Sequence, residues 1–148
     1  MALTLSPVAW GRAFAICALV DGEECPVLER LYRAEACGDS DAKAVFAQLE
    51  RVAETGIPPN KTVFKLVSTH GRPKEIMEFK KGGIRILGFR APHTPRSAVP
   101  VPVITLVGFC GKEDDNQQQS AAIERAEDRL AHCRTLPPLR IVDKEDRT

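Results

Sequence analysis

Apolar residues along the chain follow two different spacings, and each spacing predicts a different kind of element. Short, nearly continuous apolar runs predict strands at Arg12–Val20, Thr62–Val67, Ile76–Phe79, Ile84–Phe89 and Val103–Phe109. Apolar residues three and four positions apart predict a helix from Pro26 to just before Gly38, a second from Ser40 or Asp41 to just before Gly56, and a third from Ser120 to about Cys133. The first run leaves one alternative open, because Ser6-Pro7 would also suit the start of a helix.

This pattern of elements predicts an α+β fold. We expect a small, mainly antiparallel β-sheet of about four strands, with an N-terminal helical hairpin and a C-terminal helix packed on one face. A chain of 148 residues has an ordinary length for one domain. We expect that domain to span residues 1–133, and residues 134–148, which contain two prolines and many charges, to form an extended or disordered tail.

The stretch Ile76–Phe89 has the pattern of a β-hairpin, because two apolar runs flank the connection Lys80-Lys81-Gly82-Gly83. Strand alternation places Arg85 on the opposite face from Ile84 and Ile86. The hairpin should therefore bury one side and present cations near its other side or rim. Those cations are either solvated or a place for phosphate.

The overall charge, the cysteines and the length of the apolar stretches limit which ligands and partners we expect. The chain has 21 basic and 20 acidic residues and a net charge of +1, so a polyanion site must come from local clustering. Its five dispersed cysteines form no CxxC motif, which indicates reduced thiols in a cytoplasm and no metal site. The apolar stretches are too short to cross a bilayer, so we expect no membrane partner.

Several stretches of the sequence resemble the RelE/ParE superfamily of bacterial toxins, most closely its HigB-like, phage-derived branch. The first stretch is Asp21–Leu31, which has an Asp-Gly turn followed by a helix that begins with proline. The others are Phe64–Leu66 with Ile76–Lys80, then Ile84–Phe89, and finally Val103–Lys112 with Ile123–Arg129. They occur in the family's order over about residues 12–133. The resemblance implies a RelE-like fold. It also implies an endoribonuclease without a cofactor that cuts messenger RNA at the ribosome and is silenced by a cognate antitoxin.

The resemblance also implies which residues act. By matching the family's basic positions it assigns catalysis to Lys65, Lys80, Arg85 and Lys112. Arg129 on the last helix is a supporting RNA-binding residue, and the neighbouring cations His70, Arg72, Lys74 and Lys81 are further candidates for RNA binding. Clustered cations suit this chemistry, because attack of the ribose 2′-hydroxyl on phosphorus creates a doubly charged phosphorane that they can stabilise. Arginine stays charged and binds phosphate oxygens in a bidentate manner.

A second hypothesis is a catalytically inactive RelE-fold protein of phage origin that binds and inhibits or redirects a host protein. It is suggested by the near-neutral charge, by the acidic run Glu113–Asp115 and by the Pro-rich loop Arg90–Pro102. Arg90, His93 and Arg96 of that loop would then contact the partner. A gyrase-poisoning toxin of the ParE kind is a third hypothesis.

Overall fold

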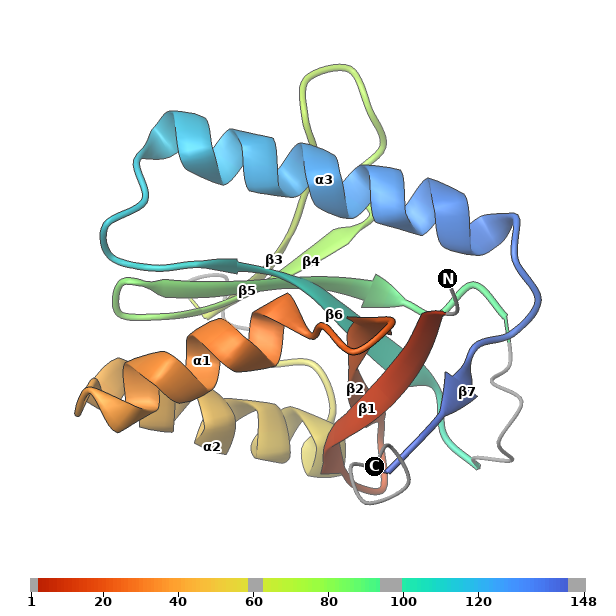
Figure 1. The fold of residues 1–148 in the computed structure, drawn as a ribbon, viewed down its shortest axis with the longest axis horizontal. Coiled ribbons are helices and arrows are strands. Elements are labelled where there is room, and N and C mark those ends of the chain that lie inside the picture. The colour runs from red at the N-terminus through yellow and green to blue at the C-terminus, as the bar shows by residue number, and fades with distance from the viewer. Residues whose placement is uncertain (1–2, 59–62, 94–99, 144–148) are drawn as a thin grey trace.

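The computed structural model describes residues 3–58, 63–93 and 100–143. Within these residues the chain forms three helices and one seven-stranded sheet with the strand order β3-β4-β5-β6-β2-β1-β7 (Figure 1). The strands are β1 (Leu3–Trp10), β2 (Ala15–Asp21), β3 (Phe64–Val67), β4 (Ile76–Lys81), β5 (Ile84–Arg90), β6 (Val103–Cys110) and β7 (Arg140–Ile141). The helices are α1 (Pro26–Ala36), α2 (Ser40–Thr55) and α3 (Asn116–Arg134).

The sheet is mixed and larger than expected, so the prediction of about four mainly antiparallel strands is wrong. Strand β2 pairs with β6 in parallel and β1 pairs with β7 in parallel, whereas the other neighbours are antiparallel. Strand β1 escaped prediction because it contains Pro7, which lacks an N–H and usually interrupts a strand. The register shifts between Pro7 and Ala9, and this irregularity accommodates the proline.

The helical hairpin is not N-terminal, which is a second correction. The antiparallel pair of β1 and β2 comes first, and α1 and α2 follow it. The two helices themselves lie where their apolar spacing predicted, because α1 begins at Pro26 and α2 ends before Gly56. The cap of α2 is Asp39, whose side chain accepts a hydrogen bond from the Asp41 N–H at 2.9 Å.

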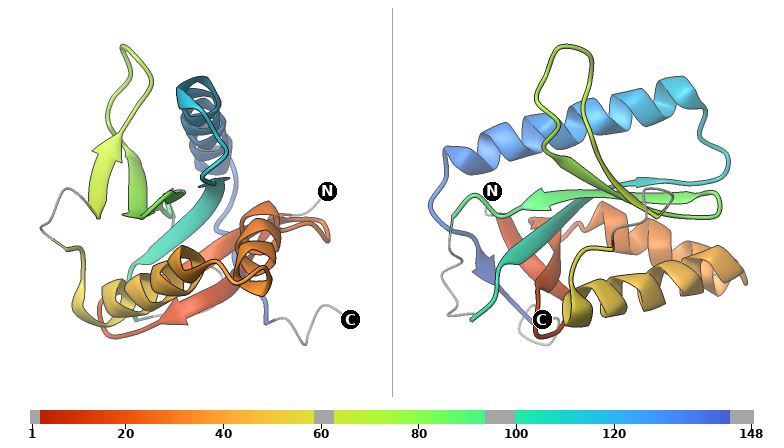
Figure 2. Two further views of the ribbon diagram at one scale, coloured as in Figure 1. Left: turned by 90° about the vertical axis from the view of Figure 1, so that its left-hand side faces the viewer. Right: turned by 180° about the vertical axis from the view of Figure 1, so that it is seen from behind.

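The helices cover both faces of the sheet, not one. Figures 1 and 2 show α1 and α2 on one side of the sheet and α3 on the other. In β4, Met77 and Phe79 belong to the core beneath α1 and α2, while Ile76 packs in the core beneath α3. Because the central strands are apolar on both faces, each face must be covered. The side covered by α3 is called the α3 side below.

Helix α3 starts four residues earlier than its apolar spacing predicted. Asp115 caps it, and Gln118 completes a capping box in which each side chain accepts a hydrogen bond from the other residue's N–H. Residues 116–119, which the apolar spacing left outside the predicted helix, therefore form its first turn. Its buried stripe contains Ala122, Ala126, Leu130 and Cys133.

The central hairpin is confirmed. Strands β4 and β5 pair in register from Met77 opposite Gly88 to Lys81 opposite Ile84. Gly82 in the turn has a φ of 56°, in the left-handed region that favours glycine. A Cβ at this position would also collide with the Asp41 carboxylate, so the turn fits closely against the start of α2.

The segment after α3 contributes to the sheet. Arg140 and Ile141 form β7 beside β1, and Leu139 and Ile141 pack on the apolar side chains of Leu5 and Leu19. This segment extends the cover of the α3 side beyond the end of α3. In the part of the chain that the structure describes, no helix has the length and apolar character needed to cross a membrane.

The position of α3 leads to a prediction for Leu130, which is 5% exposed in the core that also holds Leu87 and Phe89. We expect Leu130→Ala to lower the free energy of unfolding by about 2–4 kcal/mol, measured by urea denaturation. The matched control is Arg125→Ala on the exposed side of α3, expected to change stability by less than about 0.5 kcal/mol. Equal unfolding midpoints for the two variants would contradict this packing.

Candidate functional site

Three of the four predicted catalytic residues lie on the same side of the sheet. Lys80 is paired with Arg85 across the β4–β5 hairpin, and Lys65 of β3 is paired with Glu78 of β4. Paired residues share a face, and so do residues two apart in one strand. Glu78 is in turn paired with Leu87, which packs beneath α3. Lys65, Lys80 and Arg85 therefore form one cluster on the α3 side, called the basic face below.

The start of α3 positions Arg85. Its guanidinium Nη1 donates a hydrogen bond to the side-chain oxygen of Gln119. The Gln119 amide nitrogen in turn donates to the backbone oxygen of Asp114 at 3.2 Å, which fixes the orientation of the amide. The sequence analysis began the third helix at Ser120, one residue after Gln119, and so missed this contact. Arg85 is half-buried and keeps part of its surface open to solvent.

Glu78 lies beneath the basic face and is only 3% exposed. Its Oε1 has no hydrogen-bond partner among the described residues, and it lies 3.6 Å from Nζ of Lys65. The Lys65 side chain is half exposed. Burying a carboxylate costs free energy unless a cation or hydrogen-bond donors compensate it. In this ion pair the Glu78 side chain is buried and the Lys65 side chain is accessible to solvent.

Cys110, paired with Arg85 across β5 and β6, lies close to the same charges. Burial is the main cause that raises the pKa of its thiol, with a further contribution from Asp114, while Arg30 lowers it to a lesser extent. The thiol is therefore protonated at neutral pH and is not a nucleophile.

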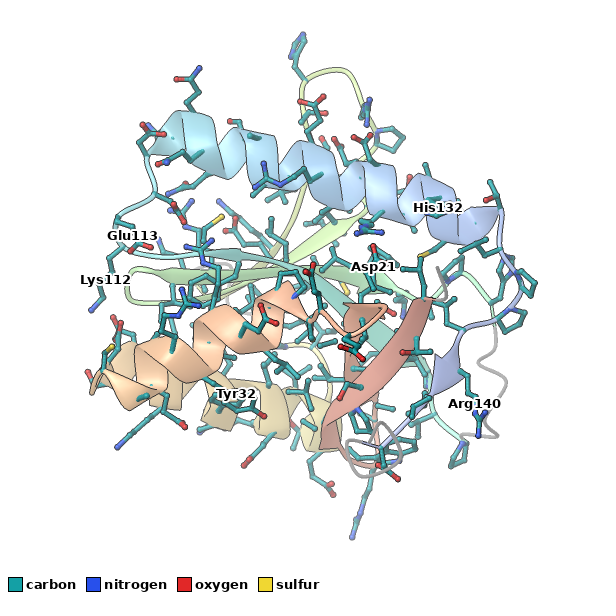
Figure 3. The ribbon with its side chains drawn as sticks, in the orientation of Figure 1. Asp21, Tyr32, Lys112, Glu113, His132 and Arg140 are labelled. Carbon is teal, nitrogen blue, oxygen red and sulfur yellow. The ribbon has the colours of Figure 1, made fainter. Side chains whose placement is uncertain are left out.

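The fourth predicted catalytic residue, Lys112, does not join the basic face. Its Nζ lies 3.1 Å from Oδ2 of Asp41 and 3.6 Å from Oδ1 of Asp39, both at the start of α2. The hydrogen bond that Lys112 donates to Asp41 and the charges of both carboxylates raise the pKa of Lys112. Figure 3 shows Lys112 and Glu113 at the end of the sheet where the β4–β5 turn lies. Lys112 fastens this end to α2.

The acidic run after β6 is also engaged. Arg30 of α1 donates hydrogen bonds to Glu113 at 3.1 Å, to Asp114 at 3.3 Å and to the backbone oxygen of Phe109 at 2.9 Å. Its guanidinium also lies 4.6 Å from the centre of the Phe109 ring. Asp115 caps α3. These acids therefore serve internal contacts, and no sequence motif had marked Arg30 as their partner.

The predicted RNA-binding residues are dispersed. Arg72 lies 3.4 Å from Glu127 of α3, which also accepts two hydrogen bonds from Thr69, so the loop between β3 and β4 is held against α3 (Figure 2). His70 and Lys74 are exposed in the same loop, and Lys81 is exposed at the β4–β5 turn. Arg129 donates a hydrogen bond to Asp21 at 3.1 Å and lies away from the basic face.

The predicted partner-binding residues lie at the far end of β5. The Arg90 guanidinium is 5.3 Å from the centre of the Phe14 ring, and Nε2 of His93 is 3.3 Å from the backbone oxygen of Arg134. Arg96 lies outside the described residues. Arg90 and His93 thus contact the domain while both residues stay exposed.

Within the residues that the structure describes, no three His, Cys, Asp or Glu side chains are grouped so that they could hold a metal ion. Comparison of the chain with protein-family models, with curated proteins and with solved structures found no match. The candidate site therefore depends on its geometry alone. Its central feature is the basic face, where three cations from three neighbouring strands lie on one side of the sheet and one of them, Lys65, pairs with the buried Glu78 carboxylate.

The contact between Asp41 and Lys112 predicts a pH dependence of stability. The Lys112 ammonium, followed by the Gly83 N–H, holds the pKa of Asp41 below its ordinary value of 3.8. A lowered folded-state pKa gives stability that is present above pH 3.8 and is lost as the pH falls through the folded-state pKa. We therefore expect Asp41→Asn to be less stable than the wild type at pH 7 and the two to converge below pH 3.8.

Urea denaturation between pH 2.5 and 7 measures this convergence, with Glu50→Gln on the exposed side of α2 as the control for the loss of one carboxylate. A stability difference that stays constant over this range would exclude the ion pair as its cause.

Proposed function

We propose that the protein binds RNA on the basic face and cleaves it as a metal-independent endoribonuclease acting on messenger RNA at the ribosome. The observation that carries the proposal is the convergence of Lys65, Lys80 and Arg85 on one side of the sheet. Three cations within one small area can bind a phosphodiester and its neighbouring phosphates. The protein's net charge of +1 makes this local clustering the source of any attraction for RNA.

Each cation has a distinct part in the proposed reaction. Arg85, oriented by Gln119, binds the non-bridging oxygens of the scissile phosphate and stabilises the phosphorane. The ribose 2′-hydroxyl loses its proton to solvent base and attacks phosphorus in line, which forms a 2′,3′-cyclic phosphate. Lys80, paired with Arg85, donates a proton to the leaving 5′-oxygen. Lys65 binds the same phosphate or the next one.

The proposal changes the set of residues suggested by the sequence. It omits Lys112, because Asp41 and Asp39 engage its ammonium, and Arg129, because Asp21 engages its guanidinium. Membership of the RelE/ParE superfamily, control by a cognate antitoxin and a cytoplasmic location stay predictions. If the wild type does not cleave RNA, the alternative is that the protein binds a host protein without catalysis.

Removal of two cations from the basic face tests the proposal. We expect Lys65→Ala combined with Arg85→Ala to slow cleavage of messenger RNA in a bacterial translation extract at least about 100-fold, because the charge that stabilises the phosphorane is lost. Cleavage by the wild type should depend on programmed ribosomes. Cut sites are mapped by primer extension with and without ribosomes.

The matched control removes one lysine and one arginine from the exposed side of α2, Lys43→Ala with Arg51→Ala, and should cleave as the wild type does. For the same proteins, the affinity for single-stranded RNA is measured at several salt concentrations. The slope of log affinity against log salt should be about −2 for the wild type and the control, which keep three cations, and about −0.7 for the basic-face variant, which keeps one. A folded wild-type protein that neither binds nor cuts RNA would refute the proposal.

A further inference from the structure

Glu78 occupies a position where a carboxylate does not help the fold. Its neighbours in β4, Ile76, Met77 and Phe79, are buried apolar residues that complete the cores on both sides of the sheet. Glu78 is as buried as they are, yet its Oε1 has no hydrogen-bond partner among the described residues. An apolar side chain of similar size would avoid the cost of burying a charge. The carboxylate therefore requires an explanation other than stability.

The explanation lies in the ion pair that Glu78 makes with Lys65. Oε1 of Glu78 is 3.6 Å from Nζ of Lys65, and the two residues are directly opposite each other in the β3–β4 register. A lysine side chain has four flexible carbons, so an ammonium on an edge strand would otherwise move over many positions. Glu78 is fixed by its burial and restrains that ammonium from below.

We propose that Glu78 is a positioning residue that holds the Lys65 ammonium over the basic face, an inference that rests on the proposed ribonuclease function. The ammonium has three N–H donors, and its contact with Glu78 at 3.6 Å is an ion pair without a hydrogen bond, so these donors are available to phosphate oxygens. The half-exposed Lys65 side chain can make those contacts. Glu78 itself is too buried to touch the RNA.

This role separates the rate of cleavage from the affinity for RNA. Glu78→Gln keeps the size of the side chain but removes one negative charge beside the phosphates, so RNA should bind at least as tightly as to the wild type. The Lys65 ammonium would no longer be held in place, and misplacement of a group by about 1 Å can slow a reaction up to about 100-fold. We expect single-turnover cleavage to be about 10- to 100-fold slower in Glu78→Gln.

The test compares the wild type, Glu78→Gln, Lys65→Ala and the double variant at saturating RNA. If Glu78 acts through Lys65, Glu78→Gln should cause no further loss of rate when Lys65 is already alanine. Wild-type cleavage by Glu78→Gln, or full additivity in the double variant, would overturn the proposal. Glu124→Gln, an exposed change of the same charge on α3, is the control and should keep the wild-type rate.

Two further measurements keep the outcomes distinct. Glu78→Met repeats the test with an apolar side chain suited to the buried site, should the glutamine variant fold poorly. The Lys65 Cε signal in NMR spectra, assigned by its absence in Lys65→Ala, should shift and gain mobility in Glu78→Gln, and this readout needs no RNA. An unchanged signal overturns the role of Glu78, whereas failure of the wild type to bind or cleave RNA overturns the proposed function.

Discussion

The parallel pairing of β2 with β6 is the constraint on which the rest of the structure depends. It joins Ala15 to Val103 and Ala18 to Leu106, strands that are distant in the sequence. A parallel pair needs a long crossover connection, and here the crossover contains both α1 and α2 and the strands β3, β4 and β5. Because β2 is buried along almost its whole length, helices or chain segments must cover both sides of the sheet. The three cations of the basic face lie on β3, β4 and β5, the strands on one side of this central pair.

Local features of the fold were predictable and long-range features were not. Pro26, the apolar spacing of α2 and the Gly82-Gly83 turn each act on their immediate neighbours, so their effects are visible in the sequence. The parallel partner of β2 depends on a residue far along the chain and leaves no local signal. The unbroken apolar run of β6 is typical of a strand buried on both faces, which requires α3 opposite α1 and α2, although we had expected the helices on one face only.

The candidate site shows the same division. We had assigned Lys80 and Lys81 to the connection of the hairpin, whereas β4 continues through both. Only with that strand length does the two-residue period place Lys80 and Arg85 on one side, and the β3 register adds Lys65. Lys112 carries the same kind of side chain, but its partners come from the start of α2 and could not be known in advance. Glu78 stands out in the sequence because it is a charged residue between the apolar residues of β4. Only the structure shows that Lys65 is its partner.

The position of β7 has a consequence for the order in which the chain can fold. Ribosomes synthesise a protein from its N-terminus, so β1 and β2 emerge early, while β6, α3 and β7 emerge last. Until then β2 lacks its parallel partner, and the apolar side of Leu5 and Leu19 has neither Leu139 nor Ile141 to cover it. Folds with such distant pairings form slowly, and their exposed strands can aggregate before completion. The nascent protein is therefore expected to need protection by chaperones until nearly all of its sequence has left the ribosome.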